Sequence, residues 1–301
     1  KMNYYAVVGI VDVLLKLVLA LVIPYVSGDH LLFYGAMMLG ITLLSFVMYV
    51  GYAKIKFIAL RLNWKVQKDL LKHMITFSGW NFFGTFACMV REQGLNIVLN
   101  LFFGPVVNAA RGIAYQVSSA LQGFVSNISV AAKPQMVSSF AEGNAERTLK
   151  LMYSMSKLSF FILYIMAVPV CLEIDYILHL WLGDVVPQHT ANFVVLVILT
   201  NFMNNLNAPL SNVVYATGKM RNYQVTFSVI NILIIPVAYV ALQMGLPPEA
   251  AFFSYFVMTV FVQIGCLYVL RTIIKISLTD YFYRLCCPLL IFSVVAIPLP
   301  Y

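Results

Sequence analysis

Four charged side chains fall inside long apolar stretches, where a charge is costly unless it faces a partner or a water-filled cavity. They are Asp12, Lys16, Arg91 and Glu92. Asp12 and Lys16 are four residues apart, so on a helix they lie one turn apart on the same face. Arg91 and Glu92 are adjacent and about 100° apart around a helix. We therefore expect Arg91 and Glu92 to pair less well with each other than Asp12 and Lys16 do.

Uncharged polar residues extend these positions into stripes at helical spacing. One stripe includes Glu92 and Asn96, and another runs from Arg111 through Gln122 to Lys133. Further polar positions follow in later apolar stretches: Asn201, Asn204, Asn205, Asn212, Gln224, Ser228 and Asn231. Hydrogen bonds between helices would account for the uncharged residues without any ligand. For the charged residues we favour a shared wet cavity.

Fixed cations inside such a cavity favour an anionic substrate. Arginine can hold a phosphate with two parallel hydrogen bonds, and lysine acts as a point charge. Two or three such groups near the middle of the membrane can replace the hydration shell of a pyrophosphate. The pattern indicates an anion and leaves its identity open.

Composition shows which elements must position these residues. The chain has 301 residues, of which 62% are apolar and 10% are charged, and its mean hydropathy is +0.89. These values exclude a soluble globular domain and a disordered chain. Long, continuously apolar segments favour helices over the short alternating strands of a membrane barrel. We predict nine spans: 3–26, 31–53, 77–102, 112–134, 156–174, 190–210, 223–243, 251–271 and 281–301.

Most of the 19 lysine and arginine residues lie in or beside alternate connections, the second (54–76), fourth, sixth and eighth. The positive-inside rule places these connections in the cytoplasm. The net charge of +8 therefore reflects topology and contact with anionic lipid headgroups, and we expect no nucleic-acid partner.

The connections themselves carry local signals. Residues 54–76 predict an amphipathic helix on the cytoplasmic surface, at the boundary between two groups of spans. Gly104 and Pro105 are expected to end the third span, and Asn108 to cap the fourth. Residues 175–189 are expected to form a short interfacial turn anchored by Trp181.

Several enzyme and metal-site signatures are absent from the sequence. Gly218 and Lys219 lack the remainder of a phosphate-binding loop. No serine nucleophile elbow occurs. The histidines have no partner at metal-ligand spacing, and the five cysteines form no spaced pair. We therefore predict that the protein is not an enzyme and holds no metal.

Short motifs along most of the chain carry a family resemblance. They are FSGWN (77–81), QGLNI (93–97), NLFFGP (100–105), GPVVNAARG (104–112), KPQ (133–135), WLG (181–183) and ATGK (216–219). Together they resemble bacterial oligosaccharide flippases (Wzx-like) of the polysaccharide-biosynthesis family, in the MATE-like (MOP) exporter superfamily. The sequence looks most similar to Bacteroidetes-type members.

The resemblance implies an all-α polytopic membrane protein with two six-helix lobes around a central cavity. Residues 1–53 would form the last two helices of the N-terminal lobe, and 54–76 the linker. Residues 77–272 would form the complete C-terminal lobe, and 280–301 the start of an extra helix. About four N-terminal helices and the C-terminal end would lie outside this sequence.

The resemblance also implies a function. Such flippases move an undecaprenyl-pyrophosphate-linked oligosaccharide, an O-antigen or capsule repeat unit, across the bacterial inner membrane by alternating access. Arg91, Lys16 and Arg111 would hold the pyrophosphate, with Gln122 and Asn96 also lining the cavity. Glu92 and Asp12 would tune these cations or couple an ion, with H⁺ and Na⁺ both open. No cofactor is implied, and the expected partners are membrane lipids and glycan polymerase or assembly proteins.

Three alternatives remain open. A MATE-type multidrug or cation antiporter would favour an unpaired acidic residue in its cavity, whereas each intramembrane acid here has a base nearby. A membrane glycan-assembly enzyme would need catalytic carboxylates or histidines at a membrane face. Glu173 and Asp175 are the only close acidic pair that we find outside the spans. A purely structural subunit would leave the charged stripes unexplained.

Overall fold

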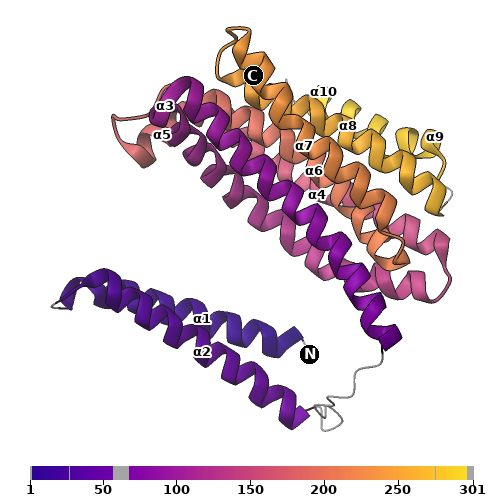
Figure 1. Ribbon diagram of the computed structural model, residues 1–301, viewed down its shortest axis with the longest axis horizontal. Coiled ribbons are helices and arrows are strands. Elements are labelled where there is room, and N and C mark those ends of the chain that lie inside the picture. Colours follow the sequence, from indigo (N-terminus) through magenta and orange to yellow (C-terminus); the bar gives the residue numbers. More distant parts are fainter. Residues whose placement is uncertain (1, 27, 57–67, 275, 297–301) are drawn as a thin grey trace. The chain divides into compact units, whose positions relative to one another are not determined.

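The computed structural model describes the chain except residues 1, 27, 57–67, 275 and 297–301. The described residues form helices and turns, without a β-strand. The chain divides into two compact units, Lys1–Leu70 (unit 1) and Leu71–Tyr301 (unit 2) (Figure 1). This all-helical architecture confirms the predicted fold class.

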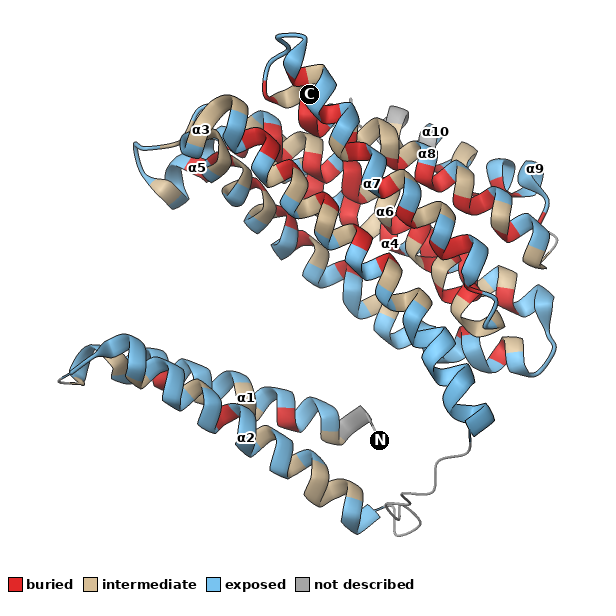
Figure 2. Cartoon of the chain, viewed as in Figure 1, coloured by how far each residue is buried: buried red, intermediate tan, exposed pale blue. Residues whose placement is uncertain are grey.

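Unit 1 contains two long helices, α1 (Met2–Val22) and α2 (His30–Lys56), joined through a short 3₁₀ turn, η1 (Ile23–Tyr25). The Asp29 side chain accepts a hydrogen bond from the backbone N–H of Leu31, which caps the start of α2. At the other end Tyr4 stacks on Tyr52, with ring centres 3.9 Å apart. Most side chains of both helices are exposed and apolar (Figure 2), as expected for helices in contact with lipid.

Unit 2 begins within the first turn of α3 (Lys68–Ala141). This element is two helical arms, 68–103 and 105–141, joined at Gly104. Gly104 has φ +76° and ψ −172°, a backbone conformation that is open essentially to glycine alone. The predicted break at this position is confirmed. The predicted cap at Asn108 is wrong, because the second arm is already helical there and Asn108 lies inside it.

The rest of unit 2 is a bundle in which α6 is the most enclosed of the long helices. Both α4 and α8 pack on α6, and α7 packs on α8. The elements after α3 are α4 (Ala145–Leu172), α5 (Ile174–Leu182), α6 (Thr190–Thr217), α7 (Arg221–Gln243), α8 (Glu249–Ile274), α9 (Leu278–Tyr281), η2 (Phe282–Cys286) and α10 (Cys287–Ala296). Buried residues are concentrated in this bundle (Figure 2).

Glycines let α3 and α7 approach closely. A Cβ atom added to Gly84 would collide with Gln224 of α7, and one added to Gly94 would collide with Ile235 of α7. Small residues are common at such crossings in membranes, because the hydrophobic effect does not drive helices together in lipid and close van der Waals packing must do so. The crossing brings the polar middle of α3 against α7.

Within the part of the chain that the structure describes, seven helices are long and apolar enough to cross a membrane, and α3 accounts for two of the predicted spans. The chain is therefore a multi-pass membrane protein. The described part of the ninth predicted span is divided among α9, a π-helical turn (η2) and α10, and its last residues, 297–301, lie outside the described residues. The turn predicted at 175–189 is wrong in part, because residues 174–182 form helix α5. Residues 57–67, about half of the amphipathic helix predicted at 54–76, lie outside the described residues; 54–56 end α2 and 68–76 begin α3.

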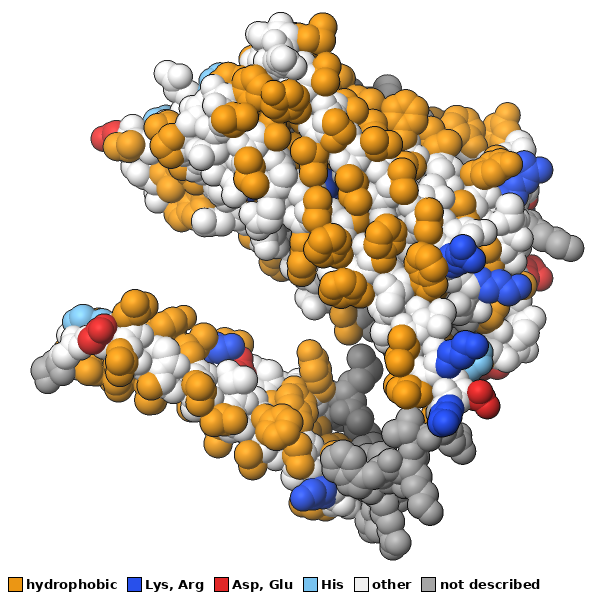
Figure 3. All heavy atoms as spheres, viewed as in Figure 1, with side chains coloured by type: hydrophobic (Ala, Val, Ile, Leu, Met, Phe, Trp, Pro, Cys, Tyr) orange, Lys and Arg blue, Asp and Glu red, His pale blue; other side chains and the backbone are white. Residues whose placement is uncertain are grey.

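Basic side chains of unit 2 gather at one end of the bundle. Figure 3 shows them near the start of α3 and near α9. A cavity at this end is lined by His73 near the start of α3, by Lys219 and Arg221 from the α6–α7 turn, and by Thr272 near the end of α8. Lys150 of the fourth connection and Arg284 of the eighth line another pocket, next to α9. The fourth, sixth and eighth connections, predicted to share one side of the membrane, thus share one end of unit 2.

Candidate functional site: a charged cluster within unit 2

The two arginines of α3 converge on one carboxylate. Arg91 Nη2 lies 2.6 Å from Glu92 Oε1, and Arg111 Nη2 lies 2.9 Å from Glu92 Oε2. Arg111 also donates to the backbone oxygen of Glu92, at 3.1 Å. Arg91 and Glu92 belong to the first arm of α3 and Arg111 to the second. The turn at Gly104 therefore brings the two cations together.

The expectation that Arg91 and Glu92 would pair less well than Asp12 and Lys16 is wrong. Both pairs are joined at 2.6 Å. The argument from helix angle considered only the direction in which each side chain leaves the backbone. Both side chains are long enough to bend toward each other across that angle, and the arginine fork offers several donors.

Arg91 is held from two further helices. Its Nη1 donates to Asn231 Oδ1 of α7. Its guanidinium carbon lies 4.5 Å from the centre of the Tyr255 ring of α8, a cation–π contact that strengthens as water is excluded. Arg111 makes the same kind of contact with Tyr115, one turn along its own helix, at 4.6 Å. The protein thus fixes the position of both cations.

The cluster carries a net positive charge. Among the described residues, Glu92 is the one acid that forms an ion pair with either arginine. Arg91 is only 9% exposed, whereas the Glu92 side chain is 30% exposed. One carboxylate can neutralise one of two guanidinium groups. The remaining positive charge makes the cluster suited to binding an anion.

The other polar stripes join α3 to α6. Asn201 donates to Ser118, and Asn205 Nδ2 donates to Gln122 Oε1 at 3.1 Å. These contacts are the interhelical hydrogen bonds that would explain the stripes without a ligand. Gln122 is therefore both a predicted cavity residue and part of the contact that holds the second arm of α3.

The remaining predicted site residues are outside this cluster. Asn96 is half-buried one helical turn beyond Glu92. Lys16 and Asp12 belong to unit 1, where Lys16 Nζ lies 2.6 Å from Asp12 Oδ2. Ser45 of α2 donates to the other oxygen of Asp12 at 3.4 Å. The sequence thus correctly indicated that Asp12 and Lys16 would pair.

Sequence reasoning missed Tyr255, which is one of many aromatic residues in a chain that is 14% aromatic. It also missed Asn207 of α6, a buried amide that lines a cavity together with Arg91. Asn207 is three residues after Asn204 and therefore shares its helix face, so the spacing could have identified it.

The sequence matches no known protein-family description and no curated protein. Its fold is similar to that of solved transporter structures. One is MATE in complex with MaL6 (TM-score 0.74, 12% identity). Another is an outward-facing multidrug resistance MATE family transporter of the MOP superfamily (TM-score 0.75, 12% identity). A third is a MOP superfamily transporter from Pyrococcus furiosus (TM-score 0.75, 13% identity).

Each of these alignments covers 89% of this chain and 62% of the solved chain. The sequence thus spans less than two thirds of the length of the transporters that it matches. Over that length, the chain has the helical fold of MATE transporters.

Proposed function

We propose that this chain is part of an exporter that moves an undecaprenyl-pyrophosphate-linked oligosaccharide across the bacterial inner membrane by alternating access. The resemblance of its motifs to oligosaccharide flippases supports the substrate. The fold supports transport, because the solved structures that share it are transporters. Binding near mid-membrane followed by rigid-body rocking fits the general logic of secondary transporters.

One observation carries the proposal: the buried Arg91 and the half-buried Arg111 share a single carboxylate. In this role Arg91 and Arg111 bind the pyrophosphate, and Glu92 keeps both guanidinium groups in position while the cavity is empty. Lys16 is a third proposed phosphate-binding cation, and Asn96 and Gln122 are proposed polar contacts. Glu92 and Asp12 are proposed to tune these cations or to couple an ion, H⁺ or Na⁺.

A multidrug or cation antiporter is the competing function, since structures with this fold include a multidrug resistance transporter. A cationic drug requires an acid that is free to receive it. Both oxygens of Glu92 are already engaged by arginines, and Asp12 is engaged by Lys16. The Pyrococcus furiosus transporter is described as having a binding pocket of reverse polarity that suggests a different function. A positively charged pocket is therefore compatible with a change of substrate class on this fold.

We also propose an arrangement for the whole protein. Unit 1 would supply the last two helices of an N-terminal lobe, and residues 77–272 would form the C-terminal lobe. The basic end of unit 2 would face the cytoplasm. Lipids and glycan-assembly proteins are its proposed neighbours in the membrane.

Binding by the purified full-length protein tests the substrate class. We expect undecaprenyl pyrophosphate to bind more tightly than the lipophilic cation tetraphenylphosphonium. Arg91→Ala is expected to weaken lipid binding at least about tenfold, because a charge-assisted bidentate contact is lost. Arg147→Ala is the matched control, since Arg147 is exposed in a loose 3.6 Å pair with Glu142. Tighter binding of the cation, unaffected by Arg91→Ala, would instead favour the antiporter.

A further inference from the structure

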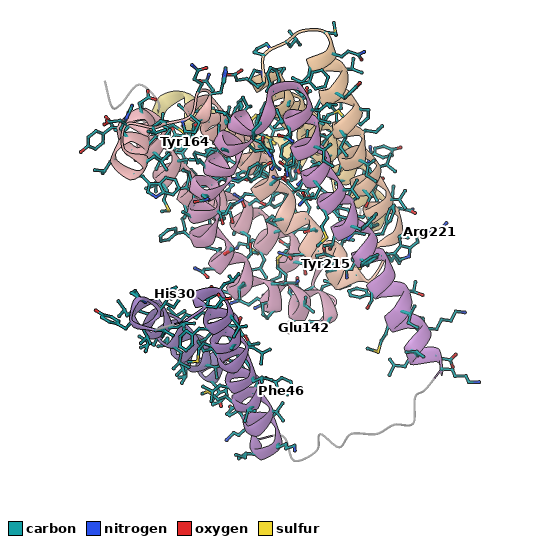
Figure 4. All side chains as sticks on the ribbon, turned by 60° about the vertical axis from the view of Figure 1, so that its left-hand side comes forward. His30, Phe46, Glu142, Tyr164, Tyr215 and Arg221 are labelled. Carbon is teal, nitrogen blue, oxygen red and sulfur yellow. The ribbon has the colours of Figure 1, made fainter. Side chains whose placement is uncertain are left out.

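The cavity at the basic end of unit 2 has a volume of about 860 Å³, within the range of roughly 300–1,000 Å³ that is typical of small-molecule sites. It lies where the first arm of α3, the α6–α7 turn and the end of α8 meet. None of its described lining residues belongs to the Arg91–Glu92–Arg111 cluster. Arg221 lies at the edge of the bundle, whereas Tyr215 lies among the helices (Figure 4). The cavity is therefore a separate feature from the candidate site.

Two cations from the α6–α7 turn line this cavity. Gly218 ends α6 in a left-handed backbone conformation (φ +70°), and Lys219 and Arg221 follow it at once. The guanidinium carbon of Arg221 lies 5.8 Å from the centre of the Trp80 ring on α3, a cation–π contact. Such a contact uses the face of the guanidinium group, so the N–H donors in its plane stay available for an anion.

These two cations have no acidic partner in unit 2. All 11 acidic residues of the chain lie in the part that the structure describes. None of these 11 lines the cavity, and none forms an ion pair with Lys219 or Arg221. A concave surface with charges of one sign concentrates ions of the opposite sign. The charge of the cavity therefore favours an anionic ligand.

The neighbouring wall of the same cavity is apolar. Met74 and Phe77, about one turn apart on α3, line it together with Ile273 of α8. Phe77 is 41% exposed. Trp80 joins the apolar and basic parts, since it lines the cavity and contacts Arg221, and tryptophan is enriched where membrane and water meet. A soluble phosphate would leave the apolar wall uncovered, whereas an acyl chain would cover it.

We propose that this cavity binds one anionic phospholipid. Its phosphate lies between Lys219 and Arg221, and the start of an acyl chain lies along Met74, Phe77 and Ile273. Basic pockets between membrane helices at the cytoplasmic side bind anionic headgroups in this way. The lipid joins the start of α3, the α6–α7 turn and the end of α8, which are distant in sequence. The proposal holds whatever substrate the protein carries.

Native mass spectrometry of the full-length protein in a neutral detergent tests the class of ligand. The probes are dioleoyl phosphatidylglycerol, dioleoyl phosphatidylcholine, which has the same chains without net charge, and glycerol 3-phosphate, which has no chains. We expect phosphatidylglycerol to bind at least about tenfold more tightly than either of the others. Equal binding of phosphatidylcholine would mean that the cations do not select the headgroup. Equal binding of glycerol 3-phosphate would mean that the cavity takes a soluble phosphate, and either result would overturn the proposal.

Arg221→Gln is expected to weaken the binding of phosphatidylglycerol at least about tenfold, because a charge-assisted contact with the phosphate is lost. Arg147→Gln is the matched control. It removes the same charge from an exposed arginine of the fourth connection, at the same end of unit 2, and is expected to change the affinity less than about twofold. Equal losses in the two variants would mean that the lipid is attracted to the basic surface in general and would refute the site.

A photoreactive phosphatidylglycerol, with a diazirine near the start of one acyl chain, locates the lipid in the unaltered protein. Crosslinks are expected on peptides that contain residues 74–80 or 272–273. Crosslinks confined to other segments would overturn the proposal, even if Arg221→Gln does not fold. Because these experiments use no lipid-linked sugar, a negative result here is distinguishable from a failure of the proposed flippase activity.

Discussion

The carboxylate of Glu92 is shared by two guanidinium groups, one from each arm of α3. Placing like charges together inside a membrane protein costs free energy, which the carboxylate, the Asn231 amide and the two tyrosine rings partly offset. The offset is incomplete, because one positive charge remains. An anionic substrate would neutralise that remaining charge. The contacts that hold Arg91 and Arg111 in place would therefore also prepare them to bind the substrate.

Arg91→Ala is expected to abolish transport while leaving membrane insertion intact. The apolar spans determine insertion, whereas the proposed phosphate contact depends on the guanidinium group. Transport can be measured by complementation in cells that lack the gene, and insertion by the amount of protein in the membrane fraction. Normal transport by Arg91→Ala would remove this residue from the proposed site.

Glu92→Gln is expected to destabilise the protein by about 2–3 kcal/mol, because it leaves two neighbouring arginines without their shared counter-charge. Glu142→Gln is the control: it breaks an exposed pair with Arg147 and should change stability by less than about 1 kcal/mol. Unfolding of both variants in detergent measures the difference. Equal effects would mean that Glu92 does not compensate the arginines.

How far the site could be predicted differs between residues. Arg91 and Glu92 were identifiable because charges inside apolar spans are rare. The contact between Glu92 and Arg111 was not, because it depends on the backbone turn at Gly104 and on how far long side chains reach. Nothing in the sequence distinguished Tyr255 from the other aromatic residues. Its role becomes visible only once α8 is packed against α3.

At the scale of elements, the turn within α3 determines the geometry of the site. Gly104 reverses the chain between the two arms, and Arg111 reaches Glu92 across that turn. The sequence predicted this break from a glycine–proline pair. It did not predict where the second arm begins or that residues 174–182 form a helix, because helix ends depend on tertiary packing as well as on local signals.

Gly104→Ala is expected to destabilise the protein by about 1–3 kcal/mol, since alanine must adopt a strained conformation at φ +76°. Gly112→Ala is the matched control in the second arm. Gly112 is helical and an added Cβ would meet no atom within 4 Å, so this change should be neutral or mildly stabilising. Thermal unfolding compares the two. A neutral Gly104→Ala would mean that the turn does not require glycine.

At the scale of the whole molecule, the fold is shared with MATE transporters at 12–13% identity. Alternating basic connections and long apolar spans are enough to specify the class of membrane protein. They are not enough to specify substrate, because charges at a few positions decide what a common bundle binds.

Single cysteines in a cysteine-free background test the proposed orientation. Glu142 lies at a turn on the proposed cytoplasmic side, and Met244 lies at a turn on the opposite side. The two test variants are Glu142→Cys and Met244→Cys. In spheroplasts, a membrane-impermeant maleimide is expected to label Met244→Cys directly. Labelling of Glu142→Cys is expected only after the membrane is permeabilised. The opposite pattern would mean that the positive-inside rule assigns this protein the wrong orientation.

The central claim is that the protein carries a lipid-linked oligosaccharide with the help of Arg91. The most direct test is to delete the full-length gene and identify by mass spectrometry the lipids that accumulate. The account predicts accumulation of undecaprenyl-pyrophosphate oligosaccharide, reversed by the gene and not by its Arg91→Ala form. An unchanged lipid pool with altered drug sensitivity would contradict it and favour the antiporter. Accumulation of translocated but unpolymerised units would contradict it in favour of a glycan-assembly enzyme.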